Sequence, residues 1–361
     1  MVTKRKTRVG IIGVGGIARG AHIPGYQKLP DVELVAFCDI IPERAKQGVE
    51  EFGAPGAKAY EDYRELLARD DIDAVSVCTP NALHAEITIA ALDAGKHVIC
   101  EKPMAIRPEE AWAMVEAAKR NDRILTIGYQ SRFGDDAQLL KSMIEDGVLG
   151  EVYYARALAL RRRGVPTWGV FLDKDKQGGG PLIDIGTHAL DLTLWLMGPG
   201  IGRPVWALGA TFRKLADRPG YNLWGPWDPA KFQVEDSGFG LITFESGAVV
   251  SVETSWALNI RESPFGTIIA GTRAGAELVD GQLRVNTDER GRLVDQTFNP
   301  GRSDSLHHRE IAHFIECVRE GKEPLVKPEE AAVVVQILDA IYRSAEARRP
   351  VEVWGKTPAQ A

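Results

Sequence analysis

Residues 8–18 read RVGIIGVGGIA, a short apolar strand pattern followed at once by a glycine-rich turn. The turn matches G-x-G-x-x-A, with Gly13 and Gly15 as its glycines and Ala18 as its small last residue. In a dinucleotide-binding unit, the first glycine permits a tight turn and the second lets the backbone approach a pyrophosphate. The small residue lets the following helix pack on the strand, and the helix N-terminus offers N–H groups to the anion. Glycine-rich turns are common, so this pattern needs support from its context.

An acidic residue supplies part of that context. The strand pattern at residues 32–38 ends in Asp39, which lies 21 residues beyond Ala18. At about this spacing a carboxylate accepts hydrogen bonds from the adenosine ribose and repels a 2′-phosphate. The next residue is Ile40, and no arginine follows at once. We therefore expect NAD rather than NADP as cofactor; the alternative is that Asp39 only caps the helix predicted from Pro42.

A lysine follows another buried strand pattern. The run at residues 96–100 leads into Glu101-Lys102-Pro103. This tripeptide sits at the carboxyl end of the predicted strand, where open α/β sheets bind their ligands. Lys102 is therefore a candidate for chemistry, although a strand-end lysine can also be a solvated cap. Residues 79–81 follow the strand pattern before it and should lie at the same edge.

The order of the patterns predicts the fold class. Strands and helices alternate over residues 8–127, which indicates a doubly wound parallel sheet. The expected strands are near 8–12, 32–38, 74–78, 97–100 and 124–127, and the expected helices near 17–28, 42–52, 61–69, 83–94 and 108–121.

The alternation ends near residue 150, where long strand patterns take over. These are near 151–162, 205–213, 236–245, 248–257, 265–271 and 292–298, with closing helices near 305–320 and 328–347. We expect an α/β Rossmann domain over residues 1–130. An α+β domain with a large, mostly antiparallel open sheet should follow over residues 131–361 and serve substrate binding and oligomerisation.

Composition narrows the class of protein. The chain has 361 residues and a formal net charge of −6, so it has no basic footprint for nucleic acid. No apolar stretch approaches the length of about 20 residues that spans a membrane. The four cysteines show neither a metal spacing nor a disulfide framework. We expect a protein of the reducing cytoplasm.

A second constellation lies in the later half. A triglycine, expected to be flexible, precedes a predicted helix that carries Asp184 and His188. Residues four apart lie on one helix face, so the carboxylate can orient the imidazole of a general base. Alternatives are a core histidine satisfied by the acid, or a metal site completed by His307 or His308.

The glycine turn at residues 13–18, the tripeptide at 101–103 and the helix with Asp184 and His188 together resemble one known family. It is the glucose–fructose oxidoreductase, inositol dehydrogenase and rhizopine-catabolism (Gfo/Idh/MocA) family, and the resemblance covers nearly the whole chain. It implies two domains with the nicotinamide between them, a catalytic set of Lys102, Asp184 and His188, and often a cis bond before the proline of the tripeptide.

The motifs and the resemblance give two sets of candidate residues, and no metal. Cofactor contacts are expected at Gly13, Gly15, Gly16, Ile17, Ala18, Asp39, Ile40, Thr79, Pro80, Asn81, His84, Glu101, Lys102 and Gln130. Substrate contacts are expected at Lys102, Gln130, Arg163, Trp168, Asp184 and His188.

Three segments leave the substrate open. Residues 128–132 read Gly-Tyr-Gln-Ser-Arg, where the family often has an asparagine or methionine. The loop at 221–229 holds two tryptophans and a tyrosine, which can stack on sugars, form a lid or contact another subunit. The arginine run at 161–163 can contact substrate or be a solvated charge run.

We therefore expect an NAD-dependent dehydrogenase that acts on a secondary hydroxyl of a cyclic polyol, sugar or glycoside. His188 would accept the proton and Lys102 would polarise the oxygen. The alternatives are a keto-sugar reductase of the same family and a non-catalytic dinucleotide-sensing protein. The partners expected are the small-molecule substrate and other copies of the chain in a homodimer or homotetramer.

Overall fold

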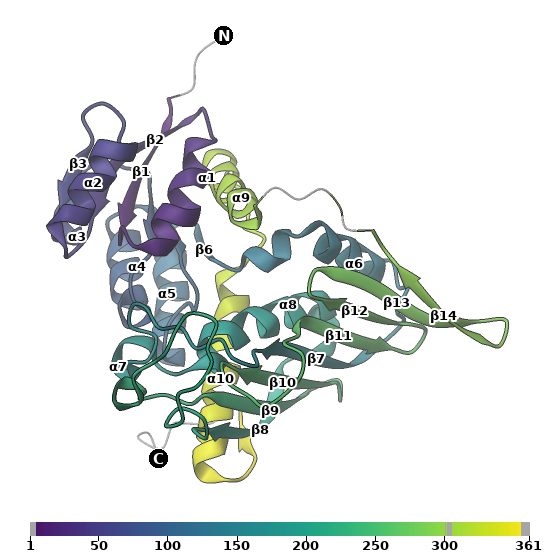
Figure 1. Ribbon diagram of the computed structural model, residues 1–361. Coiled ribbons are helices and arrows are strands. Elements are labelled where there is room, and N and C mark those ends of the chain that lie inside the picture. Colours follow the sequence, from purple (N-terminus) through teal and green to yellow (C-terminus); the bar gives the residue numbers. More distant parts are fainter. Residues whose placement is uncertain (1–4, 300, 302–304, 355–361) are drawn as a thin grey trace. The chain divides into compact units, whose positions relative to one another are not determined.

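The computed structural model describes residues 5–299, 301 and 305–354, and it divides into two compact units (Figure 1). One unit holds the described residues of 1–130 and 304–332, and the other holds those of 131–303 and 333–361. We had expected residues 131–361 to stay together. Instead, helix α9 (Leu306–Glu320) returns to pack beside α1 (Ile23–Gln27) in the first unit.

The first unit is built on a parallel six-stranded sheet in the order β3-β2-β1-β4-β5-β6, which confirms the doubly wound fold. Its strands are β1 (Thr7–Ile12), β2 (Val32–Cys38), β3 (Lys58–Tyr60), β4 (Ala74–Val77), β5 (His97–Cys100) and β6 (Leu125–Ile127). Besides α1 and α9, its helices are α2 (Pro42–Phe52), α3 (Tyr63–Leu67), α4 (His84–Asp93) and α5 (Pro108–Asn121). The edge strand β3 was not expected, because three partly exposed residues carry no apolar pattern.

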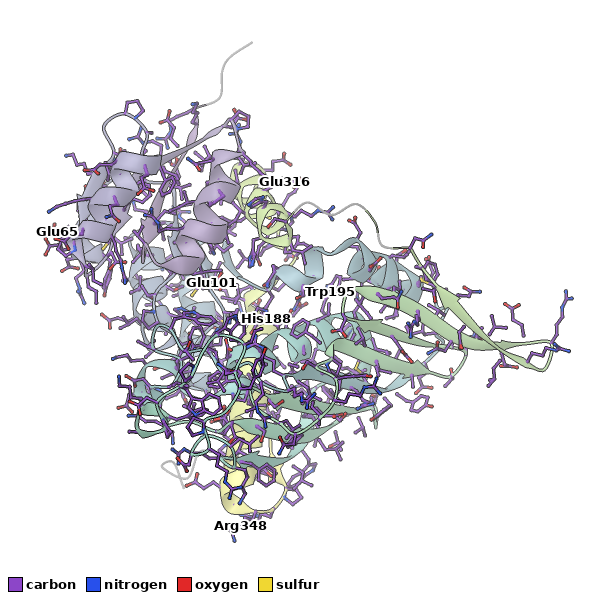
Figure 2. All side chains as sticks on the ribbon, viewed as in Figure 1. Glu65, Glu101, His188, Trp195, Glu316 and Arg348 are labelled. Carbon is purple, nitrogen blue, oxygen red and sulfur yellow. The ribbon has the colours of Figure 1, made fainter. Side chains whose placement is uncertain are left out.

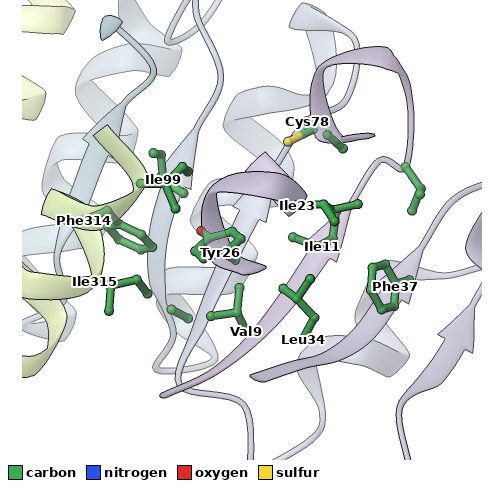
Figure 3. Packing of buried hydrophobic residues seen from close by; sticks show 14 residues of the cluster. Val9, Ile11, Ile23, Tyr26, Leu34, Phe37, Cys78, Ile99, Phe314 and Ile315 are labelled. Atoms are coloured by element: carbon green, nitrogen blue, oxygen red, sulfur yellow. The ribbon is translucent and has the colours of Figure 1, made fainter. Parts of the chain in front are cut away.

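The core of this unit explains why α9 belongs to it. Val9, Ile11 and Leu34 of the sheet are buried together with Tyr26 and with the apolar face of α9 (Figure 3). That face has Ile311, Phe314 and Ile315, at the three- and four-residue spacing of one helix side.

The helix expected over residues 17–28 is divided in two. Ala18–His22 form a π-helical turn, and α1 begins at Ile23 with Pro24 in its first turn. Proline has no N–H to donate to the preceding turn, and a local widening of the helix accommodates that loss. His22, at the end of this π-helical turn, is fully buried.

The second unit contains a nine-stranded sheet in the order β14-β13-β12-β11-β7-β10-β9-β8-β15. Only the β7–β10 pair is parallel among the described pairings, so the mostly antiparallel sheet is confirmed. The strands are β7 (Val152–Leu160), β8 (Pro204–Phe212), β9 (Ser237–Phe244), β10 (Val249–Ser255), β11 (Phe265–Gly271), β12 (Gly275–Val279), β13 (Gln282–Glu289), β14 (Arg292–Thr297) and β15 (Val351–Glu352). The helices are α6 (Asp135–Glu145), α7 (Lys174–Gln177), α8 (Thr187–Met197) and, from Val333 on, α10 (Pro328–Ala347). Neither α6 nor the strands β12, β13 and β15 were expected.

The two faces of this sheet differ. Small residues line the helix-covered face: a Cβ added at Gly209 would lie 2.2 Å from the Ile341 carbonyl oxygen of α10. The opposite face carries large apolar side chains that are partly exposed, among them Trp206 and the cross-strand pair Leu208 and Leu241. An apolar surface of this kind usually marks an interface.

Within the described residues, none of the helices combines the length and the hydropathy that a membrane crossing requires.

Candidate functional site

The glycine turn of the first unit has the shape that a dinucleotide requires. Gly13 has a φ of +89°, and a Cβ added there would lie 2.5 Å from the Cys78 carbonyl oxygen, so only glycine fits. Cβ atoms added at Gly15 or Gly16 would meet nothing within 4 Å. The tight turn and the open space beyond it match the roles expected for these glycines, so the turn fits a bound pyrophosphate.

Asp39 holds this turn in place. Its Oδ2 accepts a hydrogen bond from Val14 N at 2.9 Å, and its Oδ1 accepts one from Ile41 N at 2.9 Å. Helix α2 begins at Pro42, and Asp39 accepts the N–H of its N-cap residue Ile41, so a role at the helix start and a role at the ribose both stay predictions. Ile40 beside it is 86% exposed, which leaves an apolar surface next to the carboxylate.

Two buried polar atoms at the edge of the sheet lack partners within the described part of the chain. They are Oγ1 of Thr79 and Oε1 of Gln130. Buried polar groups are nearly always hydrogen-bonded in a complete structure, so each unsatisfied atom needs an explanation. Both residues are in the expected cofactor set, and a bound ligand would satisfy them.

His84 connects two segments of this edge. It is buried, with Nδ1 2.7 Å from the Pro103 carbonyl oxygen and Nε2 2.8 Å from the Thr79 carbonyl oxygen. Burial lowers the pKa of His84, while the two carbonyls act in the opposite direction. A neutral ring donates only one of these bonds at a time. The geometry gives His84 a positioning role between these segments, and its expected contact with the cofactor stays a prediction.

Glu101, which is labelled in Figure 2, is the centre of a buried network that sequence reasoning did not find. Its Oε1 lies 2.9 Å from Nε2 of His22, and His22 Nδ1 lies 3.1 Å from Oγ of Ser76. The Tyr26 hydroxyl lies 2.7 Å from the same Ser76 oxygen. Tyr26, Ser76, His22 and Glu101 thus form one continuous chain of buried polar contacts.

This network fixes the backbone at Lys102. Glu101 Oε2 accepts a hydrogen bond from Lys102 N at 3.1 Å, and the Lys102–Pro103 bond is cis, as the family resemblance implied. Burial raises the pKa of Glu101, but the hydrogen bond from His22 and nearby positive charges outweigh it and hold the pKa at about 2. Glu101 is therefore a buried anion directly before the candidate lysine.

In the second unit, the segment with Asp184 and His188 is not one regular helix. Leu182–Gly186 form a π-helical turn, and α8 begins at Thr187. Because a π turn is closed by i→i+5 hydrogen bonds, Asp184 and His188, which are four residues apart, are separated by no more than about one turn. Asp184 Oδ2 accepts a hydrogen bond from Trp256 Nε1 at 3.0 Å, so an indole fixes this carboxylate.

The triglycine before this segment is tightly packed, and the expectation of a flexible lead-in was wrong. A Cβ added at Gly179 would lie 2.1 Å from the Tyr342 hydroxyl, and one at Gly180 would lie 2.2 Å from the Glu235 carbonyl oxygen. Glu235 accepts hydrogen bonds from Gly180 N and from the Tyr342 hydroxyl. Burial raises the pKa of Glu235, and these bonds oppose that shift.

A buried ion pair anchors α8. Arg132 donates from Nε and Nη2 to the two carboxylate oxygens of Asp191, at 2.9 and 2.6 Å. Both side chains are almost inaccessible to solvent. Asp191 was missed, although it stands three residues after His188 and therefore near it on the helix surface.

The other candidate residues have definite environments. Arg163 donates to the Leu258 carbonyl oxygen and to Asn259 Oδ1, while Trp168 is largely exposed. His307 and His308 lie on α9, and the described residues include no group of three or more metal-ligating side chains with the geometry to hold an ion.

Comparison with protein families gives two matches that together span most of the chain. Residues 7–129 match the NAD-binding Rossmann fold of an oxidoreductase family. Residues 141–353 match the C-terminal alpha/beta domain of the same family.

Individual relatives agree with this assignment. The chain is 39% identical to D-glucoside 3-dehydrogenase of Escherichia coli (strain K12), over 98% of this chain and 99% of that one. It is 28% identical to myo-inositol 2-dehydrogenase of Thermotoga maritima, over 96% of this chain and 98% of that one. A solved structure of levoglucosan dehydrogenase with NADH and levoglucosan has a TM-score of 0.83 and 26% identity, covering 97% of this chain and all of that one.

The buried Glu101 predicts a dependence of stability on pH. Its folded-state pKa of about 2 lies below the ordinary 4.5, so its charge stabilises the fold above pH 4.5. That contribution, about 3 kcal/mol at about 1.4 kcal/mol per pKa unit, is lost as the pH falls toward 2. We expect Glu101→Gln to flatten the decrease in unfolding free energy between about pH 5 and 3, measured by denaturant titration.

The control is Glu289→Gln on the exposed part of β13, which should keep the wild-type pH dependence. An unchanged slope in Glu101→Gln would contradict the buried anion.

Proposed function

We propose a substrate and a set of catalytic residues for this chain, which belongs to the Gfo/Idh/MocA family of NAD-dependent oxidoreductases. It transfers a hydride between a secondary hydroxyl of a sugar, cyclic polyol or glycoside and the nicotinamide. Within this class the proposed substrate is a D-glucoside. The observation that carries this choice is the 39% identity with a D-glucoside 3-dehydrogenase over nearly the full length of both chains.

The proposed catalytic set assigns one task to each residue. His188 accepts the proton of the substrate hydroxyl, and Asp184 stabilises the resulting imidazolium. Asp184 is suited to this task because Trp256 already fixes its carboxylate. The Lys102 ammonium stabilises the developing alkoxide, and Glu101 fixes the backbone from which that side chain extends. NAD supplies the hydride acceptor.

The proposed cofactor contacts follow the geometry of the first unit. The pyrophosphate is held by the N–H groups that follow the turn at residues 13–18, and the ribose hydroxyls donate to Asp39. The exposed Ile40 packs on the adenine ring. Thr79 and Gln130, whose buried oxygens lack partners in the described chain, bind polar groups of the ligand.

The primary test is a panel of glucosides, monosaccharides and inositols with NAD or NADP, read by absorbance of the reduced nicotinamide. We expect glucoside oxidation with a kcat/KM for NAD at least about tenfold above that for NADP, because Asp39 repels the 2′-phosphate. The paired substitution Asp39→Ser and Ile40→Arg should narrow that ratio. Equal efficiency with both cofactors in the wild type would refute the role of Asp39.

Rates in both directions at neutral pH separate a dehydrogenase from a keto-sugar reductase. Bound NAD without turnover of any substrate in either direction would favour a sensing protein.

The catalytic assignment predicts a pattern among variants. Lys102→Ala and His188→Ala should each lower kcat by about two orders of magnitude or more, because each removes a group that acts in the transition state. Asp184→Asn should cost less, since the imidazole remains. The double variant Asp184→Asn/His188→Ala should match His188→Ala, because the two residues act as one unit. If the decreases in kcat of the two single variants instead multiply in the double variant, Asp184 contacts the substrate independently of His188.

The proposed assembly is a homodimer or homotetramer through the open face of the nine-stranded sheet. The exposed side chains Trp206, Leu208 and Leu241 support it. We expect light scattering at micromolar concentration to give at least a dimer mass. Leu208→Arg should lower that mass because it places a charge in the interface, whereas Val148→Arg, outside the sheet, should leave it unchanged. A monomeric wild type would contradict the assembly.

The proposed compartment is the cytoplasm. All four cysteines are free and buried in the described structure, as a reducing environment favours.

A further inference from the structure

A cluster of aromatic side chains in the second unit begins at the candidate catalytic carboxylate. Trp256, whose Nε1 is bonded to Asp184, contacts Phe171 with ring centroids 6.5 Å apart. Phe171 contacts Trp168 at 5.8 Å, and Trp168 contacts Trp224 at 5.0 Å. All these residues belong to one unit, so their arrangement is that of a single folded body.

Arg161 extends this cluster beyond Trp224. Its guanidinium lies 5.1 Å from the centroid of the Trp224 ring, within the range of a cation–π interaction. Burial lowers the pKa of Arg161, and the negative charge of Asp184 opposes that shift. Arg161 therefore supports the Trp224 end of the cluster.

The loop that carries Trp224 is held rigidly. The buried side chain of Asn222 accepts a hydrogen bond from Val165 N at 2.8 Å and donates to the Val165 and Gly225 carbonyl oxygens. Trp227 is buried and donates from Nε1 to the Ala216 carbonyl oxygen at 2.7 Å. These anchors fix the loop, so its remaining aromatic side chains are presented in a defined geometry.

Trp224 on this loop and Trp168, which lies on another segment of the same cluster, remain accessible. Trp168 is 51% exposed and Trp224 is 38% exposed, and their planes meet at 88°. An immobilised, nearly perpendicular pair of indoles forms an apolar corner at little entropic cost to binding, and it suits a flat ring better than a chain. Phe171 contacts both Trp168 and Trp256, so one aromatic ring separates this corner from Trp256.

Given the proposed function, we infer that Trp168 and Trp224 form a binding subsite for the aglycone ring of a glycoside whose oxidised sugar lies at Asp184 and His188. The shared chemistry of the occupant is a six-membered ring with an apolar face, either a second sugar or an aryl group. Arg161 packs against the Trp224 indole and positions it. Residues outside the reacting centre thus set which glycosides are preferred.

The test uses methyl β-D-glucoside, phenyl β-D-glucoside and cellobiose, which share the reacting ring and differ in the aglycone. Binding is measured by calorimetry with NADH present, and turnover is measured with NAD. We expect at least one two-ring glycoside to bind about three- to tenfold more tightly than the methyl glucoside, as one aromatic contact allows. Trp224→Leu should remove that preference by raising KM, with kcat nearly unchanged, and Trp224→Tyr should keep part of it.

Trp354→Leu is the matched control. Trp354 also has an arginine against its ring, with Arg203 4.5 Å from the centroid, and it is partly exposed, but it lies beside β8 outside the aromatic cluster. We expect it to keep the wild-type preference. Preference for phenyl glucoside alone assigns an aryl aglycone, and preference for cellobiose alone assigns a sugar.

Three results overturn the subsite. The first is equal affinity for all three glycosides, and the second is no detectable binding of any of them. The third is that Trp224→Leu lowers the affinity for the methyl glucoside as much as the affinity for the two-ring glycosides. Tighter binding of a two-ring glycoside that depends on Trp224, without turnover, would keep the subsite and refute the proposed reaction.

Discussion

The hydrogen bond between His22 and Glu101 is the interaction on which the functional edge of the first unit depends. A buried carboxylate is costly unless a partner compensates it, and removing one partner leaves that cost in full. Through this pair the helix after the glycine turn is tied to the end of β5, and through Ser76 to β4. The same carboxylate holds Lys102 N. One network thus holds both the helical segment that follows the glycine turn and the backbone of the candidate lysine.

The sequence predicted those parts whose signal is local. The glycine turn, Asp39 and the Glu-Lys-Pro tripeptide each need specific residues at specific spacings, and such patterns are readable before folding. The role of His22 could not be predicted from the sequence. It depends on a π-helical turn and on contacts with residues in or directly after two strands that are distant in the chain. The return of α9 was also hidden, since its apolar face shows that it packs but not where.

Some misses had a usable signal. Asp280-Gly281 separates β12 from β13 with both residues at positive φ, which is the sequence and geometry of a two-residue hairpin. The glycines at 179 and 180 gave a misleading signal. Such a run is typical of a flexible linker, but here glycine is required by close packing. There, the close approach of Tyr342 and Glu235 excludes any side chain. A run of glycines shows only that side chains are absent from the segment. Tertiary contacts are needed to tell whether glycine serves chain flexibility or close packing there.

In the second unit, the residues proposed for chemistry and those proposed for substrate choice lie on separate segments. Asp184 and His188 lie on a buried helical segment that Trp256 and the Arg132–Asp191 pair hold in place, so a change there would disturb both fold and reaction. Trp168 and Trp224 lie on loops whose anchors, Asn222 and Trp227, are different residues. Exposed side chains on an independently anchored loop can vary without moving the proposed catalytic carboxylate. Members of one family can therefore share a proton-transfer centre and still differ in the sugar that they accept.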